Sequence, residues 1–263
     1  MENVRLNSAL SQLCTAVVFC GGRATRLRDQ LRGGSKALVL LDSRPYLHSL
    51  LLRIREAGLK EVVLCVSAFT ADISELVRSG SEYGLNVRYS FDSGLLENAD
   101  ALWQARSQIR TPLAICVNGD TIFDVNFSDL IRTHCRSEAV GTLVASERLD
   151  QPHPGGVSVA ANGKVVDLHE WAQDRKVSFS IPESAKAYSN SGIYVLDMQR
   201  LLEDWSREDR IGKIEQGLLR SLAAKNKLGA LKNGDRYLLD IGTPERLMTA
   251  RTQLPSIARV FPV

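Results

Sequence analysis

The sequence lacks several features that would assign it directly to a metal-binding, membrane or secreted class of protein. Its five cysteines form no CxxC pair and its four histidines show no metal-ligand spacing, which argues against a zinc site. No apolar run approaches the length of a membrane span, and the first residues show no apolar signal segment. We therefore expect a cytoplasmic protein with buried, reduced thiols and no membrane partner.

A large excess of one charge is also missing. The chain has 33 basic and 30 acidic residues, whereas general nucleic-acid binders are usually far more basic. Two common nucleotide-binding motifs are absent as well. GxxxxGK[ST] does not occur, and Arg23 stands where GxGxxG requires its second glycine. We therefore predict that the protein has no nucleic-acid partner. The sequence contains neither a P-loop motif nor a dinucleotide-binding fingerprint.

What is present is the alternation of short apolar strands with amphipathic helices. The chain has 263 residues, of which 44% are hydrophobic, enough for a full-sized core. In the first half, strands are expected at Ala16–Phe19, Glu61–Ser67, Asn86–Tyr89 and Leu113–Val117. Helices are expected between them at Tyr46–Ala57, Ala71–Arg78 and Asn98–Ile109. This order predicts an α/β fold with a Rossmann-like, doubly wound, mostly parallel sheet, which binds ligands beyond the carboxyl ends of its strands.

The second half is richer in strand signals. Asn162-Gly163 lies between two apolar stretches and predicts a hairpin. Further strands are expected at 191–196, 228–231 and 237–239, with helices at 212–225 and from Pro244 onward. No linker or repeat separates the halves. We expect an N-terminal extension at residues 1–13 and a single domain at 14–263 that carries an inserted β-rich lobe.

The segment Cys20-Gly21-Gly22-Arg23-Ala24-Thr25-Arg26-Leu27 follows an apolar strand and is closed by Lys36. Glycines let backbone N–H groups approach an anion closely, and the basic side chains supply the opposite charge. The fork of Arg26 can bind two phosphate oxygens at once, and Lys36 adds a compact charge. A solvated basic loop is the alternative. The position directly after a buried strand favours a phosphate site.

Two aspartates from distant parts of the chain follow apolar runs. Asp120 ends Asn118-Gly119-Asp120, and Asp240 begins Asp240-Ile241-Gly242-Thr243-Pro244. Each motif is also ordinary turn chemistry. Together with the glycine loop they favour a second interpretation, in which both carboxylates hold one Mg²⁺ ion and phosphate oxygens fill its other positions.

These stretches together resemble the sugar-1-phosphate nucleotidyltransferases. That family opens with a glycine pair, then Thr-Arg-Leu and a lysine about ten residues on, matched here by Gly21-Gly22, Thr25-Arg26-Leu27 and Lys36. Its later motifs are matched in order by Gly119-Asp120, Asn190-Ser191-Gly192-Ile193-Tyr194 and Asp240 to Pro244. The matches cover residues 15 to 250. They look most like the heptose-1-phosphate and mannose-1-phosphate guanylyltransferase branch.

The resemblance implies a set of site residues. Catalytic roles would fall to Arg26, Lys36 and Asp120, with Asp120 and Asp240 as metal ligands. Nucleotide contacts would come from Cys20, Gly21, Gly22, Arg23, Ala24, Thr25, Asn98 and Gly119. The sugar phosphate would be held in the β-rich lobe by Glu170, Asn190 and Gly192.

The chain departs from the family pattern at four places. Ala24 replaces a loop glycine, and Ser35 and Ala37 replace the prolines that flank the family's lysine. At the base-binding helix, Glu97, Asn98 or Asp100 could read a base edge instead. A carboxylate can accept from the N1–H and N2–H₂ groups of guanine, so this segment allows guanine. The family's Glu-Lys pair, whose lysine holds the sugar phosphate, appears as Glu170-Trp171, and spacing selects neither Lys164 nor Lys176 as its replacement.

The expected reaction transfers a nucleotidyl group, with GTP favoured, to a heptose- or mannose-type sugar 1-phosphate. It would use Mg²⁺ and release pyrophosphate, in the synthesis of a nucleotide sugar for polysaccharide. Two alternatives remain open: transfer to a non-sugar acceptor such as a phosphocholine-like phosphate or a phosphonate, and a catalytically silent regulator that binds nucleotide sugar. Two roles are open for the apolar tail at 258–263: it would serve as a contact in a homo-oligomer, or it would pack back onto the domain.

Overall fold

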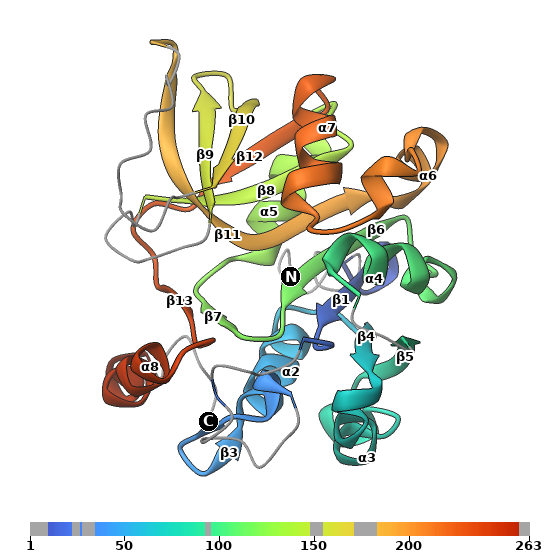
Figure 1. Cartoon of the computed structure of the whole chain (residues 1–263), viewed down its shortest axis with the longest axis vertical. Helices are drawn as coiled ribbons and strands as arrows, with labels where there is room; N and C mark the ends of the chain where they lie inside the picture. The colour runs from blue at the N-terminus through green and yellow to red at the C-terminus, as the bar shows by residue number, and fades with distance from the viewer. Residues whose placement is uncertain are drawn as a thin grey trace, which may run out of the picture.

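The fold is built on one large mixed sheet, seen in a computed structural model (Figure 1). The structure describes residues 10–22, 27, 35–92, 96–147, 155–170 and 183–257. Strands of the sheet run in the order β10-β9-β11-β6-β1-β4-β5, and β8 and β12 extend it from β11. Within the described residues, no helix is both long enough and apolar enough to cross a lipid bilayer.

The strands fall into a parallel group and a mainly antiparallel group. The parallel group is β1 (Cys14–Phe19), β4 (Glu61–Ser67), β5 (Asn86–Asp92) and β6 (Leu113–Asn118). The second group is β8 (Gly141–Ser146), β9 (Gly155–Ala160), β10 (Val165–Glu170), β11 (Ala185–Asp197) and β12 (Leu228–Lys232). Only β12 with β8 is parallel among the pairs of this second group. The expected doubly wound sheet with a β-rich lobe is confirmed, and the lobe forms the upper part of the molecule in Figure 1.

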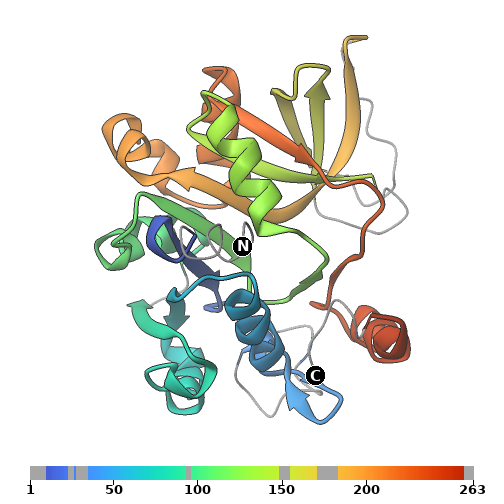
Figure 2. The same cartoon turned by 180° about the vertical axis from the view of Figure 1, so that it is seen from behind.

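Helices cover both faces of the sheet. The helices are α2 (Tyr46–Glu56), α3 (Asp72–Val77), α4 (Asn98–Ala105), α5 (Phe127–Arg136), α6 (Met198–Asp204), α7 (Arg220–Ala224) and α8 (Pro244–Ile257). Successive side chains of a strand point to opposite faces, so Ala16 and Val18 of β1 pack in the cluster of α2 while Val17 packs in the cluster of α4. Figure 2 shows α2 and α5 on the face opposite α4.

Two small strand pairs shape the edge near the site. β7 (Thr121–Phe123) pairs antiparallel with β13 (Leu238–Asp240), and β2 (Leu40–Leu41) pairs with β3 (Arg44–Pro45). The β7–β13 pairing brings residue 240 beside residue 121, although 119 positions separate them in sequence. This pairing is the physical link between the two aspartate motifs.

Several elements differ from the sequence-based expectation. Strand β8 and helices α5 and α6 were not predicted, although the Asn126 side chain caps α5 by accepting from the N–H groups of Ser128 and Asp129. The expected helix at 212–225 is a π-helical turn, Glu215–Leu219, followed by α7. The first turn before β1 is helical and buries Leu10, at 1% exposure, in the core.

Candidate functional site

A cavity of about 620 Å³ lies across the sheet at the carboxyl ends of the parallel strands. Because the cavity runs along the order of the strands in the sheet, two ends of it can be distinguished. The loop end is formed by Cys20, Gly21, Gly22, Cys65, Asp92, Glu97 and Asn98. The lobe end is formed by Gly155, Gly156, Leu168, Asn190, Gly192, Lys213, Glu215, Gln216 and Arg220. Lys36, Asp120 and Asp240 lie between the two ends.

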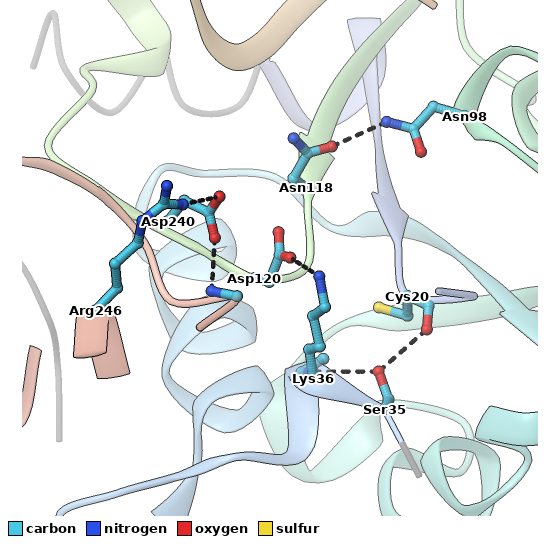
Figure 3. Close-up of polar contacts among 10 residues, drawn as sticks. Cys20, Ser35, Lys36, Asn98, Asn118, Asp120, Asp240 and Arg246 are labelled. Atoms are coloured by element: carbon cyan, nitrogen blue, oxygen red, sulfur yellow. Dashed lines mark hydrogen bonds and ion pairs between the residues drawn. The ribbon is translucent and has the colours of Figure 1, made fainter. Parts of the chain in front are cut away.

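Asp120 is the central carboxylate of the cavity. It follows β6, and its Oδ2 accepts from Lys36 Nζ at 3.1 Å (Figure 3). Their side chains are 23% and 28% exposed, so the pair is largely shielded. Burial raises the pKa of Asp120, the charge of Asp240 raises it further, and Lys36 opposes both. The two carboxylates and Lys36 therefore lie close enough together to influence one another's charge.

Asp240 is fixed on both of its carboxylate oxygens. Oδ1 accepts from the Gly242 N–H at 2.6 Å, and Oδ2 accepts from Arg246 Nη1 at 2.7 Å (Figure 3). A Cβ at Gly242 would lie 2.7 Å from Asp240 Oδ1, 3.2 Å from Lys36 Nζ and 3.5 Å from Asp120 Oδ2. Three charged groups therefore surround one point, and only a glycine leaves that point open. The sequence-predicted pair of aspartates does come together.

The backbone of the glycine loop is held from two sides. Ser35 Oγ donates to the Cys20 carbonyl at 3.1 Å, and Ser67 Oγ donates to the Gly21 carbonyl at 2.9 Å. Ser35 stands where the family has proline, and here its hydroxyl ties the lysine segment to the loop. Of the predicted nucleotide residues, Cys20, Gly21 and Gly22 line the cavity. The predictions for Arg23, Ala24, Thr25 and Arg26 lie outside the described residues.

Gly119 allows the end of β6 to pack closely against Phe19 and Cys20 at the end of β1. Its N–H donates to the Phe19 carbonyl at 3.0 Å, so that donor is already used. A Cβ there would lie 2.8 Å from the Phe19 carbonyl oxygen and 2.9 Å from Cys20 Sγ. Gly119 lines the cavity, as expected of a nucleotide-binding residue, and it also lets β6 turn against the end of β1.

A polar chain connects the nucleotide side to the lobe. Asn98 Nδ2 donates to Asn118 Oδ1 at 3.2 Å (Figure 3). Asn118 in turn packs on Gly192, where a Cβ would lie 2.4 Å from Asn118 Nδ2. Gly192 has φ +72° and sits in a β-bulge of β11, a conformation that favours glycine. The predicted residues Asn98 and Gly192 are thus joined through Asn118, which belongs to the Asn118-Gly119-Asp120 motif but was given no role of its own.

The lobe end carries a second network. The Gly192 N–H donates to Asn190 Oδ1 at 3.2 Å, and Asn190 Nδ2 donates to Tyr194 Oη at 3.0 Å. Tyr194 Oη then donates to Glu215 Oε1 at 2.7 Å, which orients that carboxylate at the cavity wall. Burial raises the pKa of Tyr194 well above its usual value, so the phenol stays a donor. Asn190 reaches the site as predicted, whereas the sequence reasoning missed Glu215.

The structure also places residues that the sequence left open as candidates. Asp100 does not line the cavity, because its Oδ2 accepts from the Gly212 N–H at 2.8 Å. Lys164 points elsewhere and donates to the Asn226 carbonyl at 2.8 Å. Glu170 ends β10 opposite Gly155, but its side chain, like Lys176, lies outside the described residues. The cations that the structure does place at the lobe end are Lys213 and Arg220.

The carboxylate ligands that this site offers fit a hard divalent cation whose other ligands are phosphate oxygens of the substrate. Across the described ranges, no cluster of three or more histidine, cysteine or acidic residues exists that could hold a metal alone. Asp120 and Asp240 provide two carboxylates, which Mg²⁺ accepts when substrate phosphates complete its shell. Glycine N–H groups, a lysine and paired carboxylates in one cleft are the chemistry of a phosphate-transfer site.

The chain matches the protein-family model described as nucleotidyl transferase over residues 15–256. It belongs to that family and is an enzyme of that type. The resemblance of its motifs to the sugar-1-phosphate nucleotidyltransferases is confirmed. Curated guanylyltransferases for heptose 1-phosphate and mannose 1-phosphate are among the proteins that it is similar to.

Two of these relatives and one solved structure show the range of the similarity. The chain is 26% identical to the D-glycero-α-D-manno-heptose 1-phosphate guanylyltransferase of Campylobacter jejuni, covering 88% of this chain and 95% of that protein. It is 27% identical to the mannose-1-phosphate guanylyltransferase of Mycobacterium tuberculosis, covering 91% and 64%. The structure of HddC from Yersinia pseudotuberculosis superposes with a TM-score of 0.72 at 19% identity, covering 91% and 99%, which shows the shared fold.

Proposed function

We propose that this nucleotidyltransferase moves a guanylyl group from GTP to a sugar 1-phosphate of the heptose or mannose type. The products would be a GDP-sugar and pyrophosphate. One observation carries the proposal: the glycine loop, Lys36, Asp120 and Asp240 meet in one cavity whose other end is a polar lobe. The named activities of the Campylobacter and Mycobacterium relatives support the choice of base and acceptor.

The reaction needs alignment more than proton transfer. A sugar 1-phosphate is largely dianionic at neutral pH, since its second pKa is about 6, so its oxygen is already a nucleophile. The chain has to place this oxygen in line with the α-phosphorus and balance the growing charge. Lys36, and by the sequence motif Arg26, would stabilise the triphosphate and the departing pyrophosphate. Asp120 and Asp240 would hold Mg²⁺, which would neutralise charge on the phosphate oxygens.

Guanine selection would come from carboxylates at the loop end. Asp92 and Glu97 both line the cavity there. A carboxylate accepts from the N1–H and N2–H₂ groups of guanine, and adenine offers no matching pair of donors on that edge. Asp100 is not available for this role, because the Gly212 N–H occupies it.

The lobe end favours a sugar phosphate over a phosphocholine-like acceptor. Its described wall holds the cations Lys213 and Arg220 with the carboxylate Glu215 and the amide Gln216. A carboxylate and an amide suit sugar hydroxyls, and cations suit a phosphate. A quaternary ammonium group would be repelled by the two cations.

The test is an assay of pyrophosphate release with each of GTP, ATP, CTP, UTP and dTTP, Mg²⁺, and a panel of acceptors. The panel contains mannose 1-phosphate, a heptose 1-phosphate, glucose 1-phosphate and phosphocholine, and mass spectrometry identifies the product. We expect release with GTP and a manno-configured 1-phosphate, abolished by EDTA and restored by Mg²⁺. Release with phosphocholine, or tight nucleotide-sugar binding with no turnover of any pair, would overturn the proposal.

A further inference from the structure

One eight-residue segment forms the lobe wall of the cavity and carries cations at both ends. Lys213, Glu215, Gln216 and Arg220 all line the cavity. Among the described lining residues at the lobe end, Lys213 and Arg220 carry a positive charge and Glu215 carries a negative charge.

The local helix explains why both cations face the cavity. The N–H groups of Gln216 and Gly217 donate to the Lys213 carbonyl at 3.1 and 3.2 Å, and the Leu219 N–H donates to the Ile214 carbonyl at 2.9 Å. Residues spaced by three and four lie on one helical face, so Lys213, Gln216 and Arg220 share it. The opposite face is anchored in the core by Ile214, Leu218 and Leu219, each 1% exposed or less.

The position of Lys213 is set by a clasp between Gly212 and α4, defined by two hydrogen bonds. The Gly212 N–H donates to Asp100 Oδ2 at 2.8 Å, and the Ala99 N–H donates to the Gly212 carbonyl at 3.1 Å. Gly212 has φ +86°, which only glycine adopts without strain. Asn98, at the start of α4, contacts Asn118, two residues before Asp120. The clasp therefore holds Lys213 near the reaction centre.

Aromatic contacts reinforce the same junction. Trp103 of α4 packs edge-on against Trp205, with ring centroids 5.2 Å apart. Arg210 lies 3.6 Å from the Trp103 ring centre, and its Nε donates to the Trp205 carbonyl at 3.1 Å. Stacking of a cation on tryptophan stabilises such a contact. The segment 205–212 is thus packed on α4 before the chain enters the lobe wall.

Arg220 is oriented by strand β10. Its Nη2 donates to the Leu168 carbonyl at 2.8 Å, which holds the guanidinium at the cavity edge. A guanidinium has five N–H donors in a planar fork, so one backbone contact leaves the group able to bind phosphate oxygens.

We propose that Lys213 and Arg220 are the clamp for the phosphate of the acceptor, and that Asp100 is a positioning residue that sets Lys213 through Gly212. This assignment rests on the proposed function. Lys213 has the larger role because the clasp places it at the junction with the reaction centre. Glu215, held by Tyr194, lies between the cations and is placed to accept from sugar hydroxyls.

The test is steady-state kinetics of Lys213→Gln, Arg220→Gln and, as a control, Lys225→Gln, an exposed lysine at the end of α7 that does not line the cavity. Losing one charge-assisted contact should raise the KM for the sugar 1-phosphate about 10- to 100-fold for Lys213→Gln and less for Arg220→Gln. The KM for the nucleoside triphosphate should change less than about threefold. Lys225→Gln should match the wild type.

The clasp is tested with Asp100→Ala and Asp100→Asn. The alanine variant loses the acceptor of the Gly212 N–H and should raise the acceptor KM about fivefold, with the nucleotide KM unchanged. The asparagine variant keeps an oxygen acceptor and should restore the acceptor KM. An equal rise in the KM for the acceptor and the KM for the nucleotide would overturn the clasp.

The two proposals fail in different ways. If the wild type turns over no sugar 1-phosphate, the proposed function is wrong. If the wild type is active and the Lys213 and Arg220 variants keep the wild-type acceptor KM, the clamp assignment is wrong. Thermal unfolding of each variant shows that the change in KM is not a loss of fold.

Discussion

The two ends of the cavity are built in opposite ways. At the loop end, the glycines and Cys20 follow β1 directly, and parallel strands bring neighbouring loops to the same edge of the sheet. At the lobe end, Gly155, Asn190 and Lys213 come from three separate segments joined by antiparallel strands and a π-helical turn. The first end shows that a local motif can define half a site. The second end shows that the other half depends on tertiary packing.

The largest effect is expected at the centre that both ends share. Asp120→Asn removes the charge that pairs with Lys36 and would hold the metal, and it should lower kcat by about 10²–10³-fold, the scale for losing one preorganised charge partner. Circular dichroism should show an unchanged fold. Asp129→Asn, an exposed change on α5, is the control and should keep full activity. An unimpaired Asp120→Asn enzyme would remove this residue from the reaction.

The next effect tests the close packing at the loop end. Gly119→Ala places a Cβ 2.8 Å from the Phe19 carbonyl oxygen and should destabilise the fold by about 1–3 kcal/mol. For a chain of this size, each kcal/mol lowers Tm by roughly 2–4 °C. Gly22→Ala is the matched control, because nothing lies within 4 Å of a Cβ there. Scanning calorimetry measures Tm for both variants. Equal Tm values for Gly119→Ala and Gly22→Ala would contradict the close packing at Gly119.

The lobe end should respond more mildly and in acceptor kinetics alone. Tyr194→Phe removes the hydroxyl that joins Asn190 to Glu215, so the acceptor KM should rise about three- to tenfold while the nucleotide KM stays the same. Tyr188→Phe, another buried tyrosine of β11, serves as the control. A change confined to the nucleotide KM would mean that the two ends are wrongly assigned.

The smallest effect is expected for the cysteines, because buried thiols should not react with a thiol reagent in the folded enzyme. Cys14, Cys20, Cys65 and Cys116 are buried, and Cys135 is exposed. Burial raises the pKa of Cys65 to about 12 and of Cys14 to about 12, so neither forms thiolate near neutral pH. Ellman's reagent at pH 8 should modify one thiol quickly in the native enzyme and all five in denaturant. Rapid modification of two or more native thiols would contradict the packing.

The sequence predicted the parallel half of the fold well because each strand there is a continuous apolar run followed by a turn signal. It also predicted the meeting of Asp120 and Asp240, because both follow apolar runs and, together with the glycine loop, favour a shared metal site. The β7–β13 pair that joins them is three residues long and has no strong local signal.

The lobe wall was missed for a physical reason. Lys213, Glu215 and Arg220 form no recognisable motif, and the helix expected at 212–225 contains a π-helical turn, Glu215–Leu219, that the sequence did not predict. Asp100 was one of three residues, with Glu97 and Asn98, that the sequence offered for contact with a base edge. The Gly212 N–H, 112 residues away, takes that carboxylate instead, and only the tertiary structure reveals it.

The central claim is that residues 120 and 240 act as one centre between the two ends of the cavity. The most direct measurement is a double-mutant cycle in kcat/KM with Asp120→Asn, Asp240→Asn and both together, using GTP, Mg²⁺ and the accepted sugar 1-phosphate. The account predicts strong non-additivity, with the double variant losing little more than the worse single variant. Losses that multiply across the two sites would contradict it, because independent residues do not share one metal and one reacting phosphate.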